Sequence, residues 1–259
     1  MSGGAESCEE LPWDSAFFGV SIARALKSHL DESSCRAMLE WCVSRRIECL
    51  YFLCSLDDSA TQRLVNEHGF QSVGVRVTLV RPPGSDAAGD SARFRTATAD
   101  DIPRLRAIAL TSHRDTRFHA DGHFDPVRCD ELYATWIEKS VEGYATHVIV
   151  AEREGAAIGY VTLHVDEKAP ALSAPRRVEG ASRTARIGLF AVDEQWRGKG
   201  IGRDLLRQAA HLLQKEDVGE TSVVTPGRNT GALALYKSAG FRTADVSLWY
   251  HRWFSHETR

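Results

Sequence analysis

The chain has 259 residues and a mass of 28.7 kDa, and this length predicts one large domain or two small ones. Its 43% hydrophobic and 26% charged residues are typical of a folded globular protein and exclude a disordered or collagen-like chain. With 32 Lys and Arg against 35 Asp and Glu, the formal net charge is -3, so no global basic field is expected to attract a nucleic acid or an anionic membrane. Any anion is therefore expected at a local site.

The apolar runs of the sequence are too short to cross a bilayer. Runs such as residues 49–54 and 187–192 fall far short of the roughly 20 residues that a transmembrane helix needs. Residues 1–10 lack the basic patch and apolar run of a secretory signal, so we expect a cytoplasmic protein. The six cysteines have no C-x-x-C pair and no metal-ligand spacing, which predicts reduced core thiols and no metal site. They are Cys8, Cys35, Cys42, Cys49, Cys54 and Cys129.

A run of Pro, Gly, Ser and Asp at residues 81–92, RPPGSDAAGDSA, has the composition of a linker. We therefore predict an N-terminal α/β domain over residues 1–81, a linker over 82–92 and a second domain over 93–259. Before the linker, apolar periodicity predicts a helix, a strand, a second helix and a second strand. These elements are expected at residues 31–45, 48–55, 60–68 and 71–80.

Behind the linker, Thr98-Ala99-Asp100-Asp101 followed by Pro103 predicts the start of a helix of about a dozen residues. Two strands separated by Gly155 predict an antiparallel hairpin, and a third strand leads into a helix that glycines open. The chain then continues with strand, helix and strand, so the predicted fold class is mixed α/β. The expected ranges are 147–153, 157–165, 185–192, 198–215, 221–225, 231–238 and 242–253.

Residues 64–70, LVNEHGF, echo residues 235–241, LYKSAGF, and each segment precedes an alternating strand. Many unrelated helices also end in Gly and are followed by Phe and a strand, so a shared module and a coincidence both stay open. If the segments are a repeat, the first copy has Val65 where the second has Tyr236 and lacks a glycine loop. We expect such a copy to be catalytically silent.

The sharpest local signal is RGKGIG at residues 197–202, between a predicted strand and a predicted helix. Glycines let a ligand approach the backbone, and the first helical turn has unpaired N–H groups. With Arg197 and Lys199 nearby, a pyrophosphate is the natural guest. The run is neither a Walker loop nor a dinucleotide fingerprint. A glycine-rich turn with solvated basic side chains is the alternative.

The run IGLFAVDEQW at residues 187–196, followed by the R-x-x-G-x-G loop, resembles the acetyl-CoA-binding segment of the GNAT N-acetyltransferase superfamily. Downstream, Asn229 and Tyr236 stand at the family's N-x(6)-Y separation, and Gly240-Phe241 completes its usual ending. The resemblance covers roughly residues 94–253. It implies the GNAT acyltransferase fold for the second domain and leaves open that the N-terminal part is a degenerate GNAT-like half.

The resemblance implies an acetyl-CoA site built largely from main chain. The backbone of Phe190, Ala191 and Val192 would pair with the pantetheine arm as an added strand would. Asn229 would contact the cofactor near its thioester, and Tyr236 would lie over the sulfur as the acid that protonates the departing thiolate. A tyrosine that only packs its ring in the core is the alternative for Tyr236. The loop amides that would take the pyrophosphate belong to Arg197, Gly198, Lys199, Gly200, Ile201 and Gly202.

The chain departs from the family at the base that deprotonates the amine. Many members carry a glutamate on the strand before the loop, whereas residues 186–189 are RIGL here. No base is carried over from the resemblance. The candidates are His164, His119 with Asp121, or a chain of water molecules that leads to backbone carbonyls.

A second resemblance concerns the acceptor. Residues 11–20, LPWDSAFFGV, and TRFHAD at 116–121 resemble segments of the dTDP-fucosamine acetyltransferases, which acetylate a nucleotide-linked 4-amino-4,6-dideoxyhexose. The second segment closes over the sugar nucleotide in that family. The resemblance therefore implies substrate contacts from Arg117, Phe118 and His119, with His164 a further candidate. Arg117 would hold the diphosphate in bidentate fashion, and a solvated helix arginine is the alternative.

The predicted function is an acetyl-CoA-dependent N-acetyltransferase that acts on the amino group of a nucleotide-linked amino sugar by direct attack in a ternary complex. Its partner is this small-molecule substrate, with no nucleic acid, membrane or metal, and a homodimer is left open. Alternatives are another small amine or a peptide amine as acceptor, or a silent CoA-binding regulatory module. The arginine-bearing segment 166–184 either reshapes the acceptor pocket or forms a polar loop.

Overall fold

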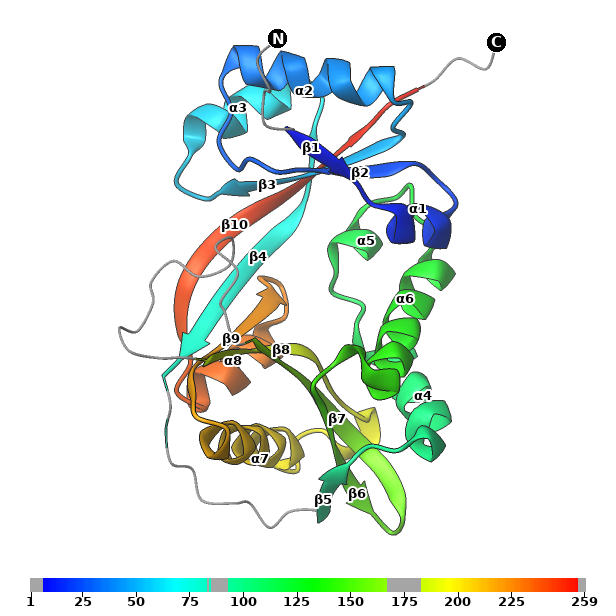
Figure 1. The fold of residues 1–259 in the computed structure, drawn as a ribbon, viewed down its shortest axis with the longest axis vertical. Helices are drawn as coiled ribbons and strands as arrows, with labels where there is room; N and C mark the ends of the chain where they lie inside the picture. The colour runs from blue at the N-terminus through cyan, green and yellow to red at the C-terminus, as the bar shows by residue number, and fades with distance from the viewer. Residues whose placement is uncertain (1–6, 83, 85–92, 167–182, 256–259) are drawn as a thin grey trace. The chain divides into compact units, whose positions relative to one another are not determined.

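The computed structural model describes residues 7–82, 84, 93–166 and 183–255 (Figure 1). Most of the predicted linker and most of the segment 166–184 lie outside these described residues. The chain divides into two compact units, and each unit collects segments that are distant in the sequence. Unit 1 comprises residues 1–76, 116–125 and 246–259, and unit 2 comprises residues 77–115 and 126–245. The domain boundaries at residues 82–92 stay a prediction.

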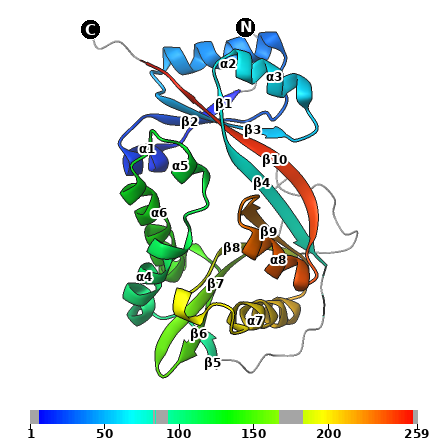
Figure 2. The same cartoon turned by 180° about the vertical axis from the view of Figure 1, so that it is seen from behind.

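Unit 1 combines a small mixed sheet with helices (Figure 2). Strand β1 pairs with β2 antiparallel, β2 with β3 parallel, and β3 with β10 antiparallel. Four predicted elements, α2, β3, α3 and β4, are confirmed within a residue or two of their expected ends. The bounds are β1 (Cys8–Glu10), α1 (Pro12–Phe18), β2 (Ile22–Ala25), α2 (Glu32–Ser44), β3 (Cys49–Ser55), α3 (Ser59–Glu67), β4 (Gln71–Arg81), α5 (Arg117–Ala120) and β10 (Arg242–Trp253). Residues 77–81 of β4 and residues 242–245 of β10 belong to unit 2.

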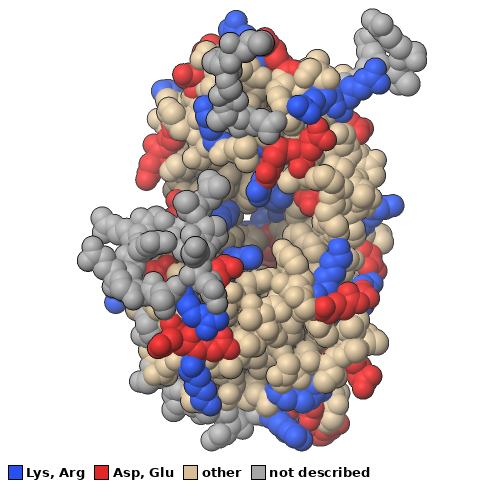
Figure 3. Space-filling view, in the orientation of Figure 1, with Lys and Arg blue, Asp and Glu red and all other residues tan. Residues whose placement is uncertain are grey.

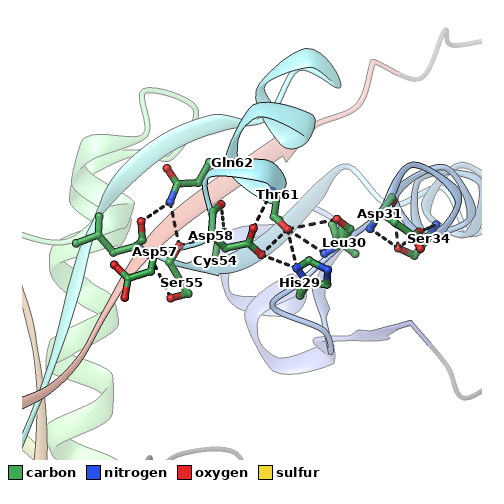
Figure 4. Close-up of polar contacts among 11 residues, drawn as sticks. His29, Leu30, Asp31, Ser34, Cys54, Ser55, Asp57, Asp58, Thr61 and Gln62 are labelled. Carbon is green, nitrogen blue, oxygen red and sulfur yellow. Dashed lines mark hydrogen bonds and ion pairs between the residues drawn. The ribbon is translucent and has the colours of Figure 1, made fainter.

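The two longer helices of unit 1 are capped at their N-termini by aspartate side chains (Figure 4). The Asp31 carboxylate accepts hydrogen bonds from the backbone N–H and the hydroxyl of Ser34, and so caps α2. The Asp58 carboxylate caps α3 by accepting the Thr61 N–H at 3.0 Å and the Thr61 hydroxyl at 2.6 Å. His29 Nδ1 lies 2.6 Å from the same carboxylate. The loop before α2 and the start of α3 are thereby joined.

We predict that Asp58→Ala lowers the melting temperature by a few degrees at neutral pH. Hydrogen bonds from Thr61 and then His29 lower the pKa of the Asp58 carboxyl below its ordinary value. Its stabilisation is therefore present above the unfolded-state pKa, near 4, and is lost as the pH falls through the lower folded-state value. The gap between variant and wild type should close in acid. Thermal unfolding followed by circular dichroism over a pH series measures both effects.

Asp57→Ala is the matched control for this prediction. Asp57 is the exposed neighbour, and its described hydrogen bond is made by its backbone N–H to Ser55. The control should melt with the wild type at every pH. Equal losses in the two variants would show that the cap contributes nothing.

Unit 2 contains the hairpin and the strand–loop–helix segment that the sequence predicts. Strands β5, β6, β7 and β8 pair antiparallel, and β8 pairs with β9 parallel. Each element predicted behind the linker is confirmed, and α6 is an additional helix. The bounds are β5 (Arg93–Thr96), η1 (Ala99–Asp101), α4 (Ile102–Ser112), α6 (Pro126–Lys139), η2 (Ser140–Tyr144), β6 (His147–Arg153), β7 (Ala156–Asp166), β8 (Arg183–Val192), η3 (Glu194–Trp196), α7 (Ile201–Lys215), β9 (Val218–Pro226) and α8 (Thr230–Ser238).

The sheet of unit 2 is buried on both faces. Residues 157–163 of β7 are all buried, because its side chains enter two different apolar clusters. Val161 and Leu163 pack with α7 residues such as Leu205, whereas Tyr160 packs with α4 residues such as Ile108. Strand β7 is therefore held from both sides, and it provides a fixed edge for β8.

Two segments of the chain have the same order of elements, but their final strands, β4 and β10, have exchanged places in the sheet. The segment β2–α2–β3–α3–β4 has the same element order as β8–α7–β9–α8–β10. Yet the strand next to β3 is β10, and the strand next to β9 is β4. The echoed sequences also share their geometry, because Gly69 after α3 and Gly240 after α8 have φ of 78° and 84°. A common origin of the two segments stays a prediction.

The described surface carries charges of both signs, and the core carries the thiols. On the face shown in Figure 3, acidic and basic side chains are mixed, which agrees with the formal net charge of -3. All six cysteines are buried and free, as the sequence predicts, and burial raises the pKa of Cys35 and of Cys54 to about 11. Among the helices of the described residues, none has the length and apolar content that a membrane span requires.

Candidate active site

Strand β8 leaves its neighbour β9 before either strand ends. The last residue pair between them is Ile187 with Val223, whereas β8 continues to Val192. On its other edge β8 stays paired with β7 as far as Val192, which lies opposite Gly159. Within the described residues, the β9-facing edge of residues 188–192 therefore has no strand partner. Such an open edge is what the added-strand pairing expected at Phe190, Ala191 and Val192 requires.

A β-bulge marks the point where β8 diverges. Two residues of β8, Gly188 and Leu189, lie opposite the single residue Thr162 of β7. The Leu189 N–H donates to the Thr162 hydroxyl oxygen at 2.7 Å, which leaves this N–H satisfied. Gly159 permits the close approach of the two strands farther along, because a Cβ there would lie 2.9 Å from the Ala191 carbonyl oxygen.

The glycine loop has the geometry that an anion needs. Gly198 and Gly200 have φ of 74° and 84°, and a Cβ at either position would meet no atom within 4 Å. Gly200 is the N-cap of α7 and has no side chain to cap the helix. The N–H groups of the first turn can therefore bind an anion. Arg197 donates to the Val192 carbonyl at 3.0 Å, and the Lys199 ammonium lies 4.6 Å from the Trp196 ring centroid. These residues fit a pyrophosphate bound by main-chain amides.

Asn229 and Tyr236 lie at the two ends of α8. The Asn229 side-chain oxygen caps the helix by accepting the Ala232 N–H at 3.0 Å. Tyr236 is 4% exposed, and its ring packs edge-on against Phe190 and Phe241. Burial raises the pKa of the Tyr236 phenol, so it stays protonated at neutral pH. Packing of the ring is thus established, and the role of Tyr236 as an acid stays a prediction.

His164 lies beside the bulge, on the face of β7 that also carries Tyr160 and Thr162. A Cβ added to Gly188 would lie 2.7 Å from His164 Nε2. Burial first, and then the nearby Arg186 guanidinium, lower the pKa of His164. The imidazole is therefore neutral at neutral pH.

Sequence reasoning missed His113, which lies at the end of α4 in unit 2. Its Nε2 lies 3.0 Å from the Tyr160 hydroxyl, and its ring stacks on Tyr133 with centroids 4.7 Å apart. Burial and the Arg197 charge lower the pKa of His113 to about 4. The ring is thus a neutral hydrogen-bonding partner on the same sheet face as His164. The sequence near His113 gives no signal for this, because Tyr160 is 47 residues away.

The other predicted acceptor residues lie in unit 1, on the short helix α5. The Arg117 guanidinium lies over the rings of Tyr51 and Trp249, at 3.9 and 4.3 Å from their centroids. Its Nη1 lies 2.8 Å from His251 Nε2. Arg117 is therefore part of an aromatic cluster rather than a fully solvated helix arginine. Whether its remaining N–H groups bind a diphosphate stays a prediction.

An Asp–His pair fixes the orientation of this arginine. A guanidinium can only donate, so His251 Nε2 accepts the Arg117 hydrogen bond. His251 Nδ1 must then carry the proton that it donates to Asp121 at 2.6 Å. Burial lowers the pKa of His251 to about 4, which agrees with this neutral form. The sequence singled out Arg117 and Asp121 but not His251, which follows them by more than 100 residues.

The remaining residues of this segment make contacts within unit 1. Phe118 is 3% exposed and packs against Phe18 and Phe124. His119 Nδ1 lies 2.8 Å from the Thr116 hydroxyl oxygen. The substrate contacts of Phe118 and His119 stay predictions. In the described part of the chain, no three His, Cys, Asp or Glu side chains are placed to hold a metal ion.

Residues 108–241 match the model of the family described as Acetyltransferase (GNAT) family. This match covers more than half of the chain, and it includes the divergent strand, the glycine loop and α8. The chain belongs to this family. It is an N-acetyltransferase with the GNAT fold.

Two curated proteins extend the similarity toward the N-terminus. The chain is 29% identical over 250 residues to the dTDP-fucosamine acetyltransferase of Escherichia coli O6:H1, an alignment that covers 95% of this chain and 98% of that protein. It is 26% identical over 193 residues to the spore coat polysaccharide biosynthesis protein SpsD of Bacillus subtilis, with 72% and 60% coverage. Among solved structures, a GCN5-related N-acetyltransferase from Sphaerobacter thermophilus shares the fold at a TM-score of 0.61 and 15% identity, covering 95% of this chain and 76% of that one.

We predict that Gly200→Ala weakens the binding of coenzyme A. A Cβ at φ of 84° costs about 1–2 kcal/mol, and relief of this strain would turn the loop amides away from the bound anion. The dissociation constant, measured by calorimetry, should rise about tenfold or more.

Gly155→Ala is the matched control, because Gly155 has φ of 81° and open space but lies in the β6–β7 turn. Both variants should lose similar stability in thermal unfolding. Only Gly200→Ala should lose affinity for coenzyme A. An equal loss of affinity in both variants would show that the loop is not part of the cofactor site.

Proposed function

We propose that this N-acetyltransferase uses acetyl-CoA to acetylate the amino group of a nucleotide-linked amino sugar, of the dTDP-4-amino-4,6-dideoxyhexose type. The observation that carries the acceptor is the similarity to a dTDP-fucosamine acetyltransferase over nearly the whole of both chains. A match confined to the cofactor-binding segment would not indicate which acceptor is used, because one fold serves many substrates. The similarity to SpsD, a polysaccharide biosynthesis protein by name, points to the same chemical class.

The donor site rests on the divergence of β8 from β9. The free backbone edge at Phe190, Ala191 and Val192 can accept the pantetheine arm in the manner of an added strand. The amides of loop 197–202 and the start of α7 can bind the pyrophosphate. Asn229 has its side-chain oxygen committed to the α8 cap, so its NH₂ group is the part available to the cofactor. Acetyl-CoA supplies an acetyl group activated as a thioester.

The chemistry is direct transfer in a ternary complex. The amine nitrogen forms a bond to the thioester carbonyl carbon, electrons move onto the carbonyl oxygen, and the C–S bond then breaks. The Tyr236 phenol donates its proton to the thiolate and recovers one from solvent. Because burial raises the pKa of Tyr236, the phenol is fully protonated when the thiolate forms. The sum is amine plus acetyl thioester giving amide plus thiol.

The test of this function is thiol release from acetyl-CoA with a panel of acceptors: dTDP- and UDP-linked amino sugars, amino acids and peptides. Turnover with a dTDP-linked 4-amino sugar, and little with the free amino sugar, is expected. Turnover with peptides alone would overturn the acceptor class. Coenzyme A binding without thiol release from any acceptor would favour the regulatory module.

We predict that Tyr236→Phe lowers kcat by about 10²–10⁴-fold and leaves the affinity for coenzyme A unchanged. The substitution keeps the ring that packs on Phe190 and removes only the proton donor. Steady-state kinetics and calorimetry measure the two quantities. Tyr250→Phe, at a buried tyrosine of unit 1, is the control and should keep its kcat. Full activity of Tyr236→Phe would remove the acid role.

A cytoplasmic location stays a prediction, and a homodimer stays open.

A further inference from the structure

The bulge in β8 creates a gap that a neighbouring histidine fills. Gly188 has no side chain, and a Cβ built there would lie 2.7 Å from His164 Nε2 and 2.8 Å from the Thr162 hydroxyl oxygen. Real Cβ atoms do not approach other heavy atoms so closely. The His164 ring edge therefore occupies the volume that any other residue at 188 would claim.

The place of this histidine follows from strand pairing. Ile187 is the last residue of β8 that pairs with β9, so Gly188 is the first residue of the free edge. Gly188 is exposed, and His164 is partly exposed. His164 Nε2 consequently lies against the first residue of the edge where the proposed acetyl-CoA site begins.

The surroundings of the ring favour a neutral proton acceptor. The groups that act on it are Arg186 of β8, Asp166 farther along β7 and Tyr144 of η2. Burial and Arg186 lower the pKa of His164 below 6.5, and Asp166 and a hydrogen bond to the Tyr144 backbone oppose them. The Tyr144 ring lies edge-on at 5.2 Å and limits how the imidazole can turn. Thr162 is a poor competitor as a base, since its hydroxyl oxygen already accepts the Leu189 N–H.

We propose that His164 is the general base of the transfer and that Gly188 is glycine to make room for it. The proposal rests on the proposed function. As the amine nitrogen bonds to the acetyl carbon, His164 Nε2 takes the N–H proton, directly or through one water molecule, and later releases it to solvent. Tyr236 supplies the separate proton that the thiolate needs, so the two residues together leave an amide and a thiol.

The first test is His164→Gln, assayed with whichever amine of the acceptor panel the wild type acetylates. We expect kcat to fall about 10²-fold or more, with unchanged affinity for coenzyme A. In the wild type, kcat/KM should decline as the pH falls through the His164 pKa, below 6.5, because the base becomes protonated. This acidic limb should disappear in the variant. His211→Gln, an exposed histidine of α7, is the matched control and should keep both kcat and the limb.

The second test displaces the ring without removing it. In Gly188→Ala the new methyl group excludes His164 Nε2 from its position, so kcat should fall although the histidine is intact. Added imidazole should restore part of the activity of His164→Ala. Unchanged kcat and an unchanged acidic limb in His164→Gln would overturn the proposal even if the acceptor is a nucleotide sugar. If only peptides are acetylated and the His164 variants still show these effects, the proposed sugar acceptor is wrong but the role of His164 as the base is supported.

Discussion

The site depends on one constraint in strand pairing: β8 stays bonded to β7 up to Val192 but leaves β9 after Ile187. Strand β7 is packed on both faces and holds one edge of β8 up to Val192, while the other edge of β8 is open beyond Ile187. The backbone groups of residues 188–192 that neither β7 nor Arg197 engages therefore remain available to a ligand that can act as a strand. The loop that follows, with Gly198 and Gly200 in the left-handed region, presents the start of α7 just after this free edge.

Most of this frame could be predicted from the sequence because its signals are local. The glycine loop, the helix start at residues 98–103 and the two strands on either side of Gly155 each depend on a few neighbouring residues, and the structure places these elements where the sequence predicts them. Helix α6 also has a local signal, since Cys129, Leu132 and Ile137 are spaced to share one helical face and are buried. The short strands β1 and β2 give no comparable pattern.

The contacts that specify chemistry are the part the sequence could not supply. His164 faces Gly188 only because a bulge shifts the register by one residue, and register is set by the pairing of whole strands. His113 reaches Tyr160, and Arg117 reaches His251, across 47 and 134 residues. The periodicity of apolar residues gives no information on contacts between residues so far apart in the sequence. The sequence could therefore name histidines and an arginine as candidates, but it could not say what each one touches.

The exchanged strands impose an order on folding. Strand β3 bonds to β10 from Cys49 with Trp253 to Ser55 with Ser247, and β10 emerges from the ribosome after every other strand. While the chain is being synthesised, the N-terminal half must wait with an open sheet edge, although its helices α2 and α3 are already capped. Such an edge is a template for intermolecular pairing. A chain that has not yet added β10 therefore presents the edge of β3 to such pairing.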